Sequence, residues 1–178
     1  GLMVVAKNEY VHGYLSKQFK EGKVDKRYFA LVHGRMGGES GRIDHPIARH
    51  PRRRKEMAVA PEKGKKALTL WKKREEIGDC FTLLEVTLKT GRTHQIRVHL
   101  SHAGHPIVGD KVYGHRVAWW KGHCPQGMSI VPQIKRQMLH SGYLGFVHPV
   151  SKSYSEYKAA PPEDMDKLLM EIKRIFMQ

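Results

Sequence analysis

The residue types best suited to chemistry gather near the middle of the chain. From Thr90 to Leu100 the sequence reads T-G-R-T-H-Q-I-R-V-H-L, and the run H-x-G-H-P-I-V-G-D-x-x-Y-G follows it to Gly114. Arginine, histidine and glutamine side chains can bind phosphate, 2′-hydroxyl groups or base edges. A guanidinium can also hold a carboxylate with two parallel hydrogen bonds. The stretch therefore predicts a polar site, with Arg97 as its most informative residue.

Three further segments fit the pattern of the same protein family as the Thr90–Gly114 stretch. Tyr28 lies in K-R-Y-F-A-L-V-H-G, which fits the pattern K-x-Y-x-A-x-V-x-G. Residues 53–67 and the block R-Q-M-L-H at 136–140 also match. Together with the Thr90–Gly114 motif, these segments resemble the RluA-type RNA pseudouridine synthases, which isomerise uridine in RNA. The resemblance spans nearly the entire chain, but residues 119–134 depart from it.

The resemblance implies roles for two residues. The phenol ring of Tyr28 is expected to stack on the uracil, and its hydroxyl to help move the C5 proton. Arg97 is expected to pair with the catalytic aspartate and to fill the space left by the flipped base. The alternatives are an ordinary strand tyrosine and a surface arginine on a helix, although Arg97 stands between apolar Ile96 and Val98.

The family's nucleophilic aspartate is missing from the chain. It belongs to a motif H-R-L-D-x-x-T-S-G, and the sequence begins at what resembles the last glycine of that motif, Gly1. Asp25, Asp44 and Asp110 stand in other contexts. We therefore expect the aspartate just upstream of Gly1 and expect these 178 residues alone to be inactive. The alternative function is a non-catalytic RNA-binding remnant or fragment.

The charge of the chain points to a polyanionic partner. Lys and Arg number 32 against 17 Asp and Glu, a formal net charge of +15, and eleven of these cations lie between Arg49 and Arg74. We expect RNA, ribosomal more than transfer, as the partner. The alternative for the basic cluster at 52–55 is a solvated loop. The expected RNA-binding residues are Arg52, Arg53, Arg54, Lys55, Arg92, His94, Gln95, His99, Arg136 and His140.

No metal or cofactor is expected. His99, His102 and His105 recur at three-residue steps, but no acidic or thiolate ligand accompanies them at a familiar spacing. A metal-dependent nuclease would need clustered carboxylates or histidine ligands. Isomerisation of uridine, as the resemblance implies it, needs neither metal nor cofactor.

Length and composition predict one domain spanning residues 1–178. Many members of the family that the chain resembles carry an S4-like RNA-binding domain, and none is expected in these residues. We expect a monomer. Cys80 and Cys124 form no C-x-x-C pair and suggest no disulfide framework, so a reducing cytoplasm is expected. No apolar run approaches the length that spans a bilayer.

Periodicity predicts the elements that position the site. We expect strands at 2–6, 27–32, 67–74, 81–88, 139–147 and 154–159. Helices are expected after Asn8, from Thr93 to Gly104 and after Pro162. Residues 119–134 predict a loop from their glycines and prolines. The fold class is α+β, with a mixed, largely antiparallel sheet and flanking helices, as in a pseudouridine synthase catalytic domain.

Overall fold

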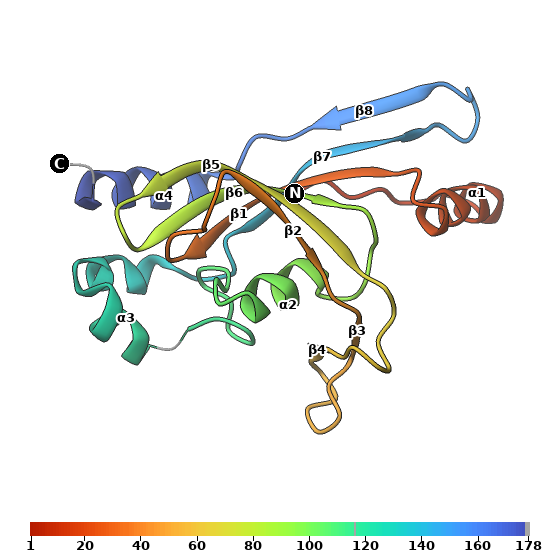
Figure 1. The fold of residues 1–178 in the computed structure, drawn as a ribbon. Coiled ribbons are helices and arrows are strands. Elements are labelled where there is room, and N and C mark those ends of the chain that lie inside the picture. Colours follow the sequence, from red (N-terminus) through yellow and green to blue (C-terminus); the bar gives the residue numbers. More distant parts are fainter. Residues whose placement is uncertain (116, 177–178) are drawn as a thin grey trace.

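A six-stranded sheet forms the centre of the computed structural model, which describes residues 1–115 and 117–176 (Figure 1). Its strand order is β2-β5-β6-β1-β7-β8, and every neighbouring pair is antiparallel. The expected α+β class with a largely antiparallel sheet is confirmed. The strands are β1 (Asp25–His33), β2 (Ser40–Asp44), β5 (Leu68–Ile77), β6 (Phe81–Leu88), β7 (Leu139–Val147) and β8 (Tyr154–Lys158).

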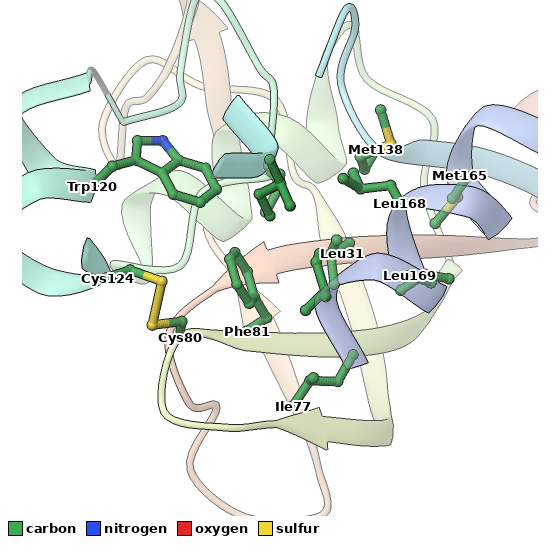
Figure 2. Packing of buried hydrophobic residues seen from close by; sticks show 13 residues of the cluster. Leu31, Ile77, Cys80, Phe81, Trp120, Cys124, Met138, Met165, Leu168 and Leu169 are labelled. Carbon is green, nitrogen blue, oxygen red and sulfur yellow. A yellow bond between two sulfur atoms is a disulfide. The ribbon is translucent and has the colours of Figure 1, made fainter. Parts of the chain in front are cut away.

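Helices cover both faces of the sheet because side chains alternate along the central strand β1. Ala30 and Val32 pack with Ile96 and Leu100 of α2 (Gln95–His102). Leu31 instead packs on the other face with α4 (Glu163–Phe176), whose Leu168 and Leu169 lie close to it in Figure 2. The face of β1 that meets α2 also carries Tyr28.

A small hairpin projects from the body of the protein below the sheet in Figure 1. It consists of β3 (Ile47–Arg49) and β4 (Met57–Val59), paired antiparallel. Ile47 packs against Val98 of α2, which anchors the base of the hairpin. The sequence pattern did not predict β2, β3 and β4. The three residues of β3 and of β4 show too few alternations to be recognised.

Several local predictions are confirmed. The helix α1 (Glu9–Lys20) begins at Asn8, whose side-chain oxygen accepts a hydrogen bond from the backbone N–H of Val11 at 2.9 Å. The strands β6 and β7 have the predicted bounds. Helix α4 begins one residue after Pro162, as a proline at the first turn favours.

The prediction of a strand at residues 2–6 is wrong, because no regular strand forms there. The segment is extended but outside the named strands, and its backbone tie to the sheet is the hydrogen bond from the Leu2 N–H to the Ser141 oxygen, 2.9 Å long. Leu2, Val4 and Ala6 pack against the cluster of Leu15 and Leu144. The apolar residues are therefore explained by burial without full strand pairing.

The prediction of a loop at residues 119–134 is also wrong. Helix α3 (Val117–His123) and the 3-10 helix η1 (Pro125–Gln133) occupy this stretch. Gly127 serves close packing, because a Cβ there would lie 2.9 Å from Cys124 Sγ and 3.0 Å from the Trp120 ring. Burial of Trp120 and Ile130 in the core overrides the turn signals.

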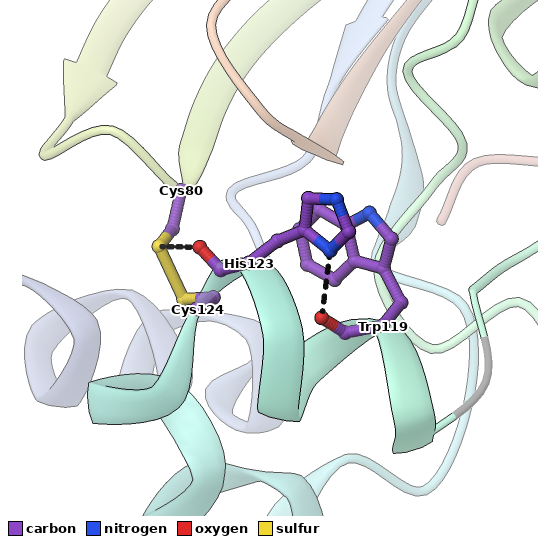
Figure 3. The surroundings of a disulfide bond; sticks show 4 residues. All are labelled: Cys80, Trp119, His123 and Cys124. Carbon is purple, nitrogen blue, oxygen red and sulfur yellow. Dashed lines mark hydrogen bonds between the residues drawn. A yellow bond between two sulfur atoms is a disulfide. The ribbon is translucent and has the colours of Figure 1, made fainter.

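The two cysteines correct another prediction, because Cys80 and Cys124 form a disulfide (Figure 3). They stand 44 residues apart in sequence, yet the fold brings their Cα atoms to 5.8 Å. Spacing alone did not reveal this contact between the start of β6 and the end of α3. The bond ties α3 to the sheet, beside the ring of His123 that stacks on Trp119.

Candidate functional site

Tyr28 lies in the middle of the sheet, on the face that α2 covers. It stands opposite Val86 of β6 on one side and Ser141 of β7 on the other. The side chain is half-buried. Burial raises the pKa of its phenol, with a smaller opposing effect from the Ser141 side chain. The hydroxyl is therefore protonated at neutral pH.

The first residue of the chain lies beside the strand partner of Tyr28. Gly1 approaches Ser141 so closely that a Cβ on it would stand 2.5 Å from the Ser141 nitrogen. Ser141 in turn pairs with Tyr28 across the sheet. This close contact accounts for a glycine at position 1 and places Gly1 against β7 at the residue that pairs with Tyr28.

The turn between β6 and α2 is held by the side chain of Gln95. Its carbonyl oxygen accepts hydrogen bonds from the Thr90 hydroxyl at 2.8 Å and the Arg92 backbone N–H at 2.9 Å. Its amide nitrogen donates to the Leu68 oxygen and the Thr69 hydroxyl, both at 3.0 Å. Gln95 is 2% exposed. Its burial supports a role in shaping the turn rather than direct contact with RNA.

Arg97 and Asp110 form a buried ion pair with two parallel hydrogen bonds. Arg97 Nε donates to one carboxylate oxygen at 2.6 Å and Nη2 to the other at 2.7 Å. The side chain of Arg97 is 13% exposed and that of Asp110 is fully buried. Burial would raise the pKa of Asp110, but the Arg97 hydrogen bonds and two backbone N–H donors hold it below the usual value. Within the described residues, the carboxylate partner of Arg97 is thus Asp110.

Tyr113 extends this cluster to His94. The Arg97 guanidinium lies over the Tyr113 ring, 4.8 Å from its centre. The Tyr113 hydroxyl accepts from the Met57 backbone N–H at 2.8 Å and lies 2.9 Å from His94 Nδ1. His94 has a left-handed backbone, with φ of 55°, and burial lowers the pKa of its imidazole. The sequence motif did not reveal the parts played by Asp110 and Tyr113, although G-D-x-x-Y-G placed them three residues apart.

The hydrogen bonds and the cation–π contact of Arg97 are made with Asp110 and Tyr113 and not with Tyr28. Tyr28 packs in the cluster that includes Ile96, whereas Arg97 stands one position further round α2 and contacts the 110–113 segment. Both residues nevertheless belong to the same layer, on one face of the sheet.

Three of the other expected RNA-binding residues make contacts within the protein, two of them buried and Arg136 at the surface. His99 is fully buried, with its ring nitrogens 2.8 Å from the Thr69 hydroxyl and 2.9 Å from the His45 oxygen. His140 is 5% exposed and lies 3.3 Å from the Ala159 oxygen. Arg136 binds Asp164 through two hydrogen bonds of 2.7 Å. These contacts indicate structural roles.

The remaining expected residues are accessible. Arg52, Arg53, Arg54 and Lys55 are exposed in the turn between β3 and β4, at the tip of the projecting hairpin. Arg53 is paired with Glu56 at 3.0 Å. Arg92 is exposed in the turn before α2, and its Nε donates to the Lys66 oxygen at 2.9 Å. Arg92 lines two cavities, of about 450 and 580 Å³.

Neither a metal site nor a membrane span is found in the part of the chain that the structure describes. At residues 1–115 and 117–176, no group of three or more His, Cys, Asp or Glu side chains has the geometry to hold a metal ion. Over the same residues, each helix is too short or too polar to cross a bilayer.

Comparison with known proteins decides the family. The sequence profile described as RNA pseudouridylate synthase matches residues 1–102, more than half of the chain. The chain belongs to the RNA pseudouridylate synthase family. This confirms the resemblance drawn from the motifs around Tyr28 and Arg97.

Relatives of this family match almost the whole chain. It is 41% identical over 169 residues to the uncharacterised RNA pseudouridine synthase YjbO of Bacillus subtilis, covering 95% of this chain and 54% of the relative. It is 41% identical over 173 residues to the ribosomal large subunit pseudouridine synthase D of Yersinia pestis, covering 97% and 52% respectively. The chain thus spans about half the length of the curated relatives it matches.

Solved structures agree on the fold. Human RNA pseudouridylate synthase domain containing 1 is 28% identical, with a TM-score of 0.69 over 95% of this chain and 74% of its own. Human RNA pseudouridylate synthase domain containing 4 is 22% identical, with a TM-score of 0.74 over 98% and 71%, a likeness of fold alone.

Proposed function

We propose that this protein isomerises uridine to pseudouridine in RNA, with Tyr28 at the target base. The reaction breaks the N1–C1′ glycosidic bond, turns the freed uracil and joins C5 to C1′. The proton on C5 leaves and N1 gains one, so the reaction is balanced without a cofactor or metal. The site must therefore hold a loose base and a carboxylate nucleophile.

The observation that carries the proposal is the position of Gly1 beside the strand partner of Tyr28 in a chain of this family. An aspartate attached shortly before Gly1 would lie near the strand pair of Ser141 and Tyr28, where it could act at the same base. Two of the aspartates inside the chain are engaged elsewhere. Asp110 is held by Arg97, and Asp25 accepts a hydrogen bond from the Tyr154 hydroxyl at 2.8 Å.

The raised pKa of Tyr28 favours one of its two expected roles. A protonated phenol in a half-buried position offers an aromatic face for stacking and a hydrogen-bond donor. It is a poor acceptor for the C5 proton at neutral pH. We therefore assign Tyr28 to holding the flipped uracil.

Arg97 is the second residue of the proposed site. Asp110 holds Nε and Nη2, which fixes the guanidinium plane and leaves Nη1 for a second carboxylate. In this proposal the upstream aspartate is that carboxylate. Arg97 then orients the nucleophile and occupies the position that the flipped base leaves.

The substrate that best fits is ribosomal RNA. Several relatives are named ribosomal large subunit pseudouridine synthase D, and the exposed cations at 52–55 and Arg92 suit a phosphate backbone. Transfer RNA is the second substrate to test. We further propose that the protein acts as a monomer.

Release of tritium from RNA labelled at uridine C5 tests the proposal. The 178-residue chain is compared with the same chain preceded by an H-R-L-D-x-x-T-S segment. We expect tritium release from the extended protein and none from the chain alone. RNA binding without release in both proteins would favour the alternative, a non-catalytic RNA-binding protein. Release by the chain alone would place the nucleophile elsewhere.

A further inference from the structure

A cavity beside the proposed site has a buried lysine in its wall. The cavity holds about 580 Å³ and lies between the C-terminal end of α1 and the turn at residues 89–92. Lys26 is 5% exposed, and its ammonium lies 5.4 Å from the centre of the Phe19 ring. A Cβ built on Gly91 would stand 3.9 Å from the same nitrogen. The ammonium therefore lies beside the turn at residues 89–92, in the wall of the cavity.

The charge around this cavity is not balanced. Lys20, Lys89 and Arg92 also line it, and Glu21 is the acid in its wall. Glu21 already pairs with Lys23, at 2.8 Å. Burial lowers the pKa of Lys26, and its neighbour Asp25 offsets this in part. A charged group on a largely buried residue is costly, so an anion in the cavity would stabilise the ammonium.

We propose that this cavity binds a phosphodiester group of RNA, with Lys26 as the buried contact and Lys20, Lys89 and Arg92 around the entrance. The inference rests on the proposed function, because it takes RNA as the substrate. A free inorganic phosphate offers the same chemistry and serves as a probe.

The position of the cavity relates it to the target nucleotide. Lys26 and Tyr28 are two residues apart on β1, so their side chains emerge on the same face about 7 Å apart. The phosphate at Lys26 then belongs to a nucleotide at or next to the base on Tyr28. The second cavity, lined by Arg49, Lys63 and Lys65, shares Gly91 and Arg92 with the first and extends the basic surface toward the hairpin.

The test measures RNA affinity at several salt concentrations for the wild-type protein and for Lys26→Met. Lys121→Met, at an exposed position on α3, is the matched control. When the protein neutralises one phosphate fewer on a single strand, the slope of log affinity against log salt becomes shallower by about 0.7. We expect that change in Lys26→Met and none in the control. Phosphate should raise the thermal midpoint of the wild type but not that of Lys26→Met.

An unchanged slope in a folded Lys26→Met protein would overturn the proposal. If that variant does not fold, the double variant Lys20→Met/Lys89→Met, at two exposed entrance positions, replaces it. A shallower slope of log affinity against log salt is again expected, and an unchanged slope would again overturn the proposal. The outcomes separate the two proposals. Unchanged slopes in a protein that makes pseudouridine reject the phosphate cavity alone, whereas a wild type that neither binds RNA nor makes product rejects the proposed function.

Discussion

The guanidinium of Arg97 and the carboxylate of Asp110 bind each other side by side, through hydrogen bonds of 2.6 and 2.7 Å. The same carboxylate accepts the backbone N–H groups of Val112 and Tyr113. One buried acid therefore fixes both the arginine and the 110–113 turn. This rigidity is what a positioned guanidinium requires if it is to orient a second carboxylate.

Replacing Asp110 should destabilise the fold strongly. Asp110→Asn leaves Arg97 charged and largely buried without its carboxylate, and breaking a buried pair costs about 3–5 kcal/mol. Urea unfolding measures this loss. Asp164→Asn, at the more exposed pair with Arg136, is the control and should cost less. Equal losses in the free energy of unfolding would show that the buried Arg97–Asp110 pair stabilises the fold no more than the exposed Arg136–Asp164 pair.

Asp110 should also contribute to acid sensitivity. Its folded pKa lies below the unfolded value, so its stabilising effect is present above the unfolded pKa of about 3.9 and disappears as pH falls through the folded value.

Acid should weaken the protein from a higher pH as well, because of His33. This ring is 2% exposed, its Nδ1 has no hydrogen-bond partner within the described residues, and burial followed by repulsion from His115 lowers its pKa to about 3. The unfolded chain takes up the proton near pH 6.5, so stability falls as pH drops from about 6.5 toward 3, by about 1.4 kcal/mol per unit. His33→Leu should show a shallower decline in urea unfolding between about pH 6.5 and 4. An identical decline would mean that His33 is not neutral in the fold.

Two substitutions at Tyr28 separate stacking from proton transfer. Stacking of a base on an aromatic ring contributes about 1–3 kcal/mol, which corresponds to about 5- to 150-fold in rate if it is lost at the transition state. Tyr28→Ala should therefore lose about that much pseudouridine formation in the aspartate-containing protein, whereas Tyr28→Phe should lose much less. Equal losses in both variants would assign the essential role to the hydroxyl.

Reduction of the Cys80–Cys124 bond should lower stability. Loop closure over 44 residues predicts a loss of about 4 kcal/mol, and the cysteines are buried beside Phe81 and Trp120. The thermal midpoint of the wild type should drop in reducing agent. A Cys80→Ser/Cys124→Ser protein should have this low midpoint both with and without reducing agent. Two titratable thiols in the natively folded, unreduced protein would contradict the bond.

The hairpin tip should contribute charge but no chemistry. Changing Arg52, Arg54 and Lys55 to Ala should make the salt dependence of RNA affinity shallower, by about 0.7 for each phosphate of single-stranded RNA that the tip no longer neutralises. Turnover at saturating RNA should not change, because the tip lies in the hairpin that projects away from the sheet carrying Tyr28 (Figure 1). Arg53→Ala is the comparison, and it should change the slope less, because Arg53 is already paired with Glu56. An unchanged slope would make the tip a solvated loop.

The sequence predicts the strands that carry long apolar runs, such as β6 and β7, because alternation and turn residues are local signals. It does not predict contacts that depend on distant parts of the chain. The Cys80–Cys124 bond and the burial of Trp120 are of this kind, and both Cys124 and Trp120 lie where turn residues suggested a loop. The motif around Arg97 identified the family, yet its buried members have internal partners: Gln95 holds the turn before α2, and His99 contacts Thr69 and His45. Polarity in a motif does not reveal exposure.

The most direct test of the central claim is a count of pseudouridine in ribosomal RNA transcripts incubated with the protein that includes an aspartate upstream of Gly1. Nucleosides are separated after digestion, with the Arg97→Lys protein as comparison. We expect pseudouridine to appear with the wild type and to fall sharply with the variant, whose single ammonium cannot form the paired hydrogen bonds. A folded wild-type protein that binds the RNA and forms no pseudouridine from either ribosomal or transfer RNA would contradict the proposal.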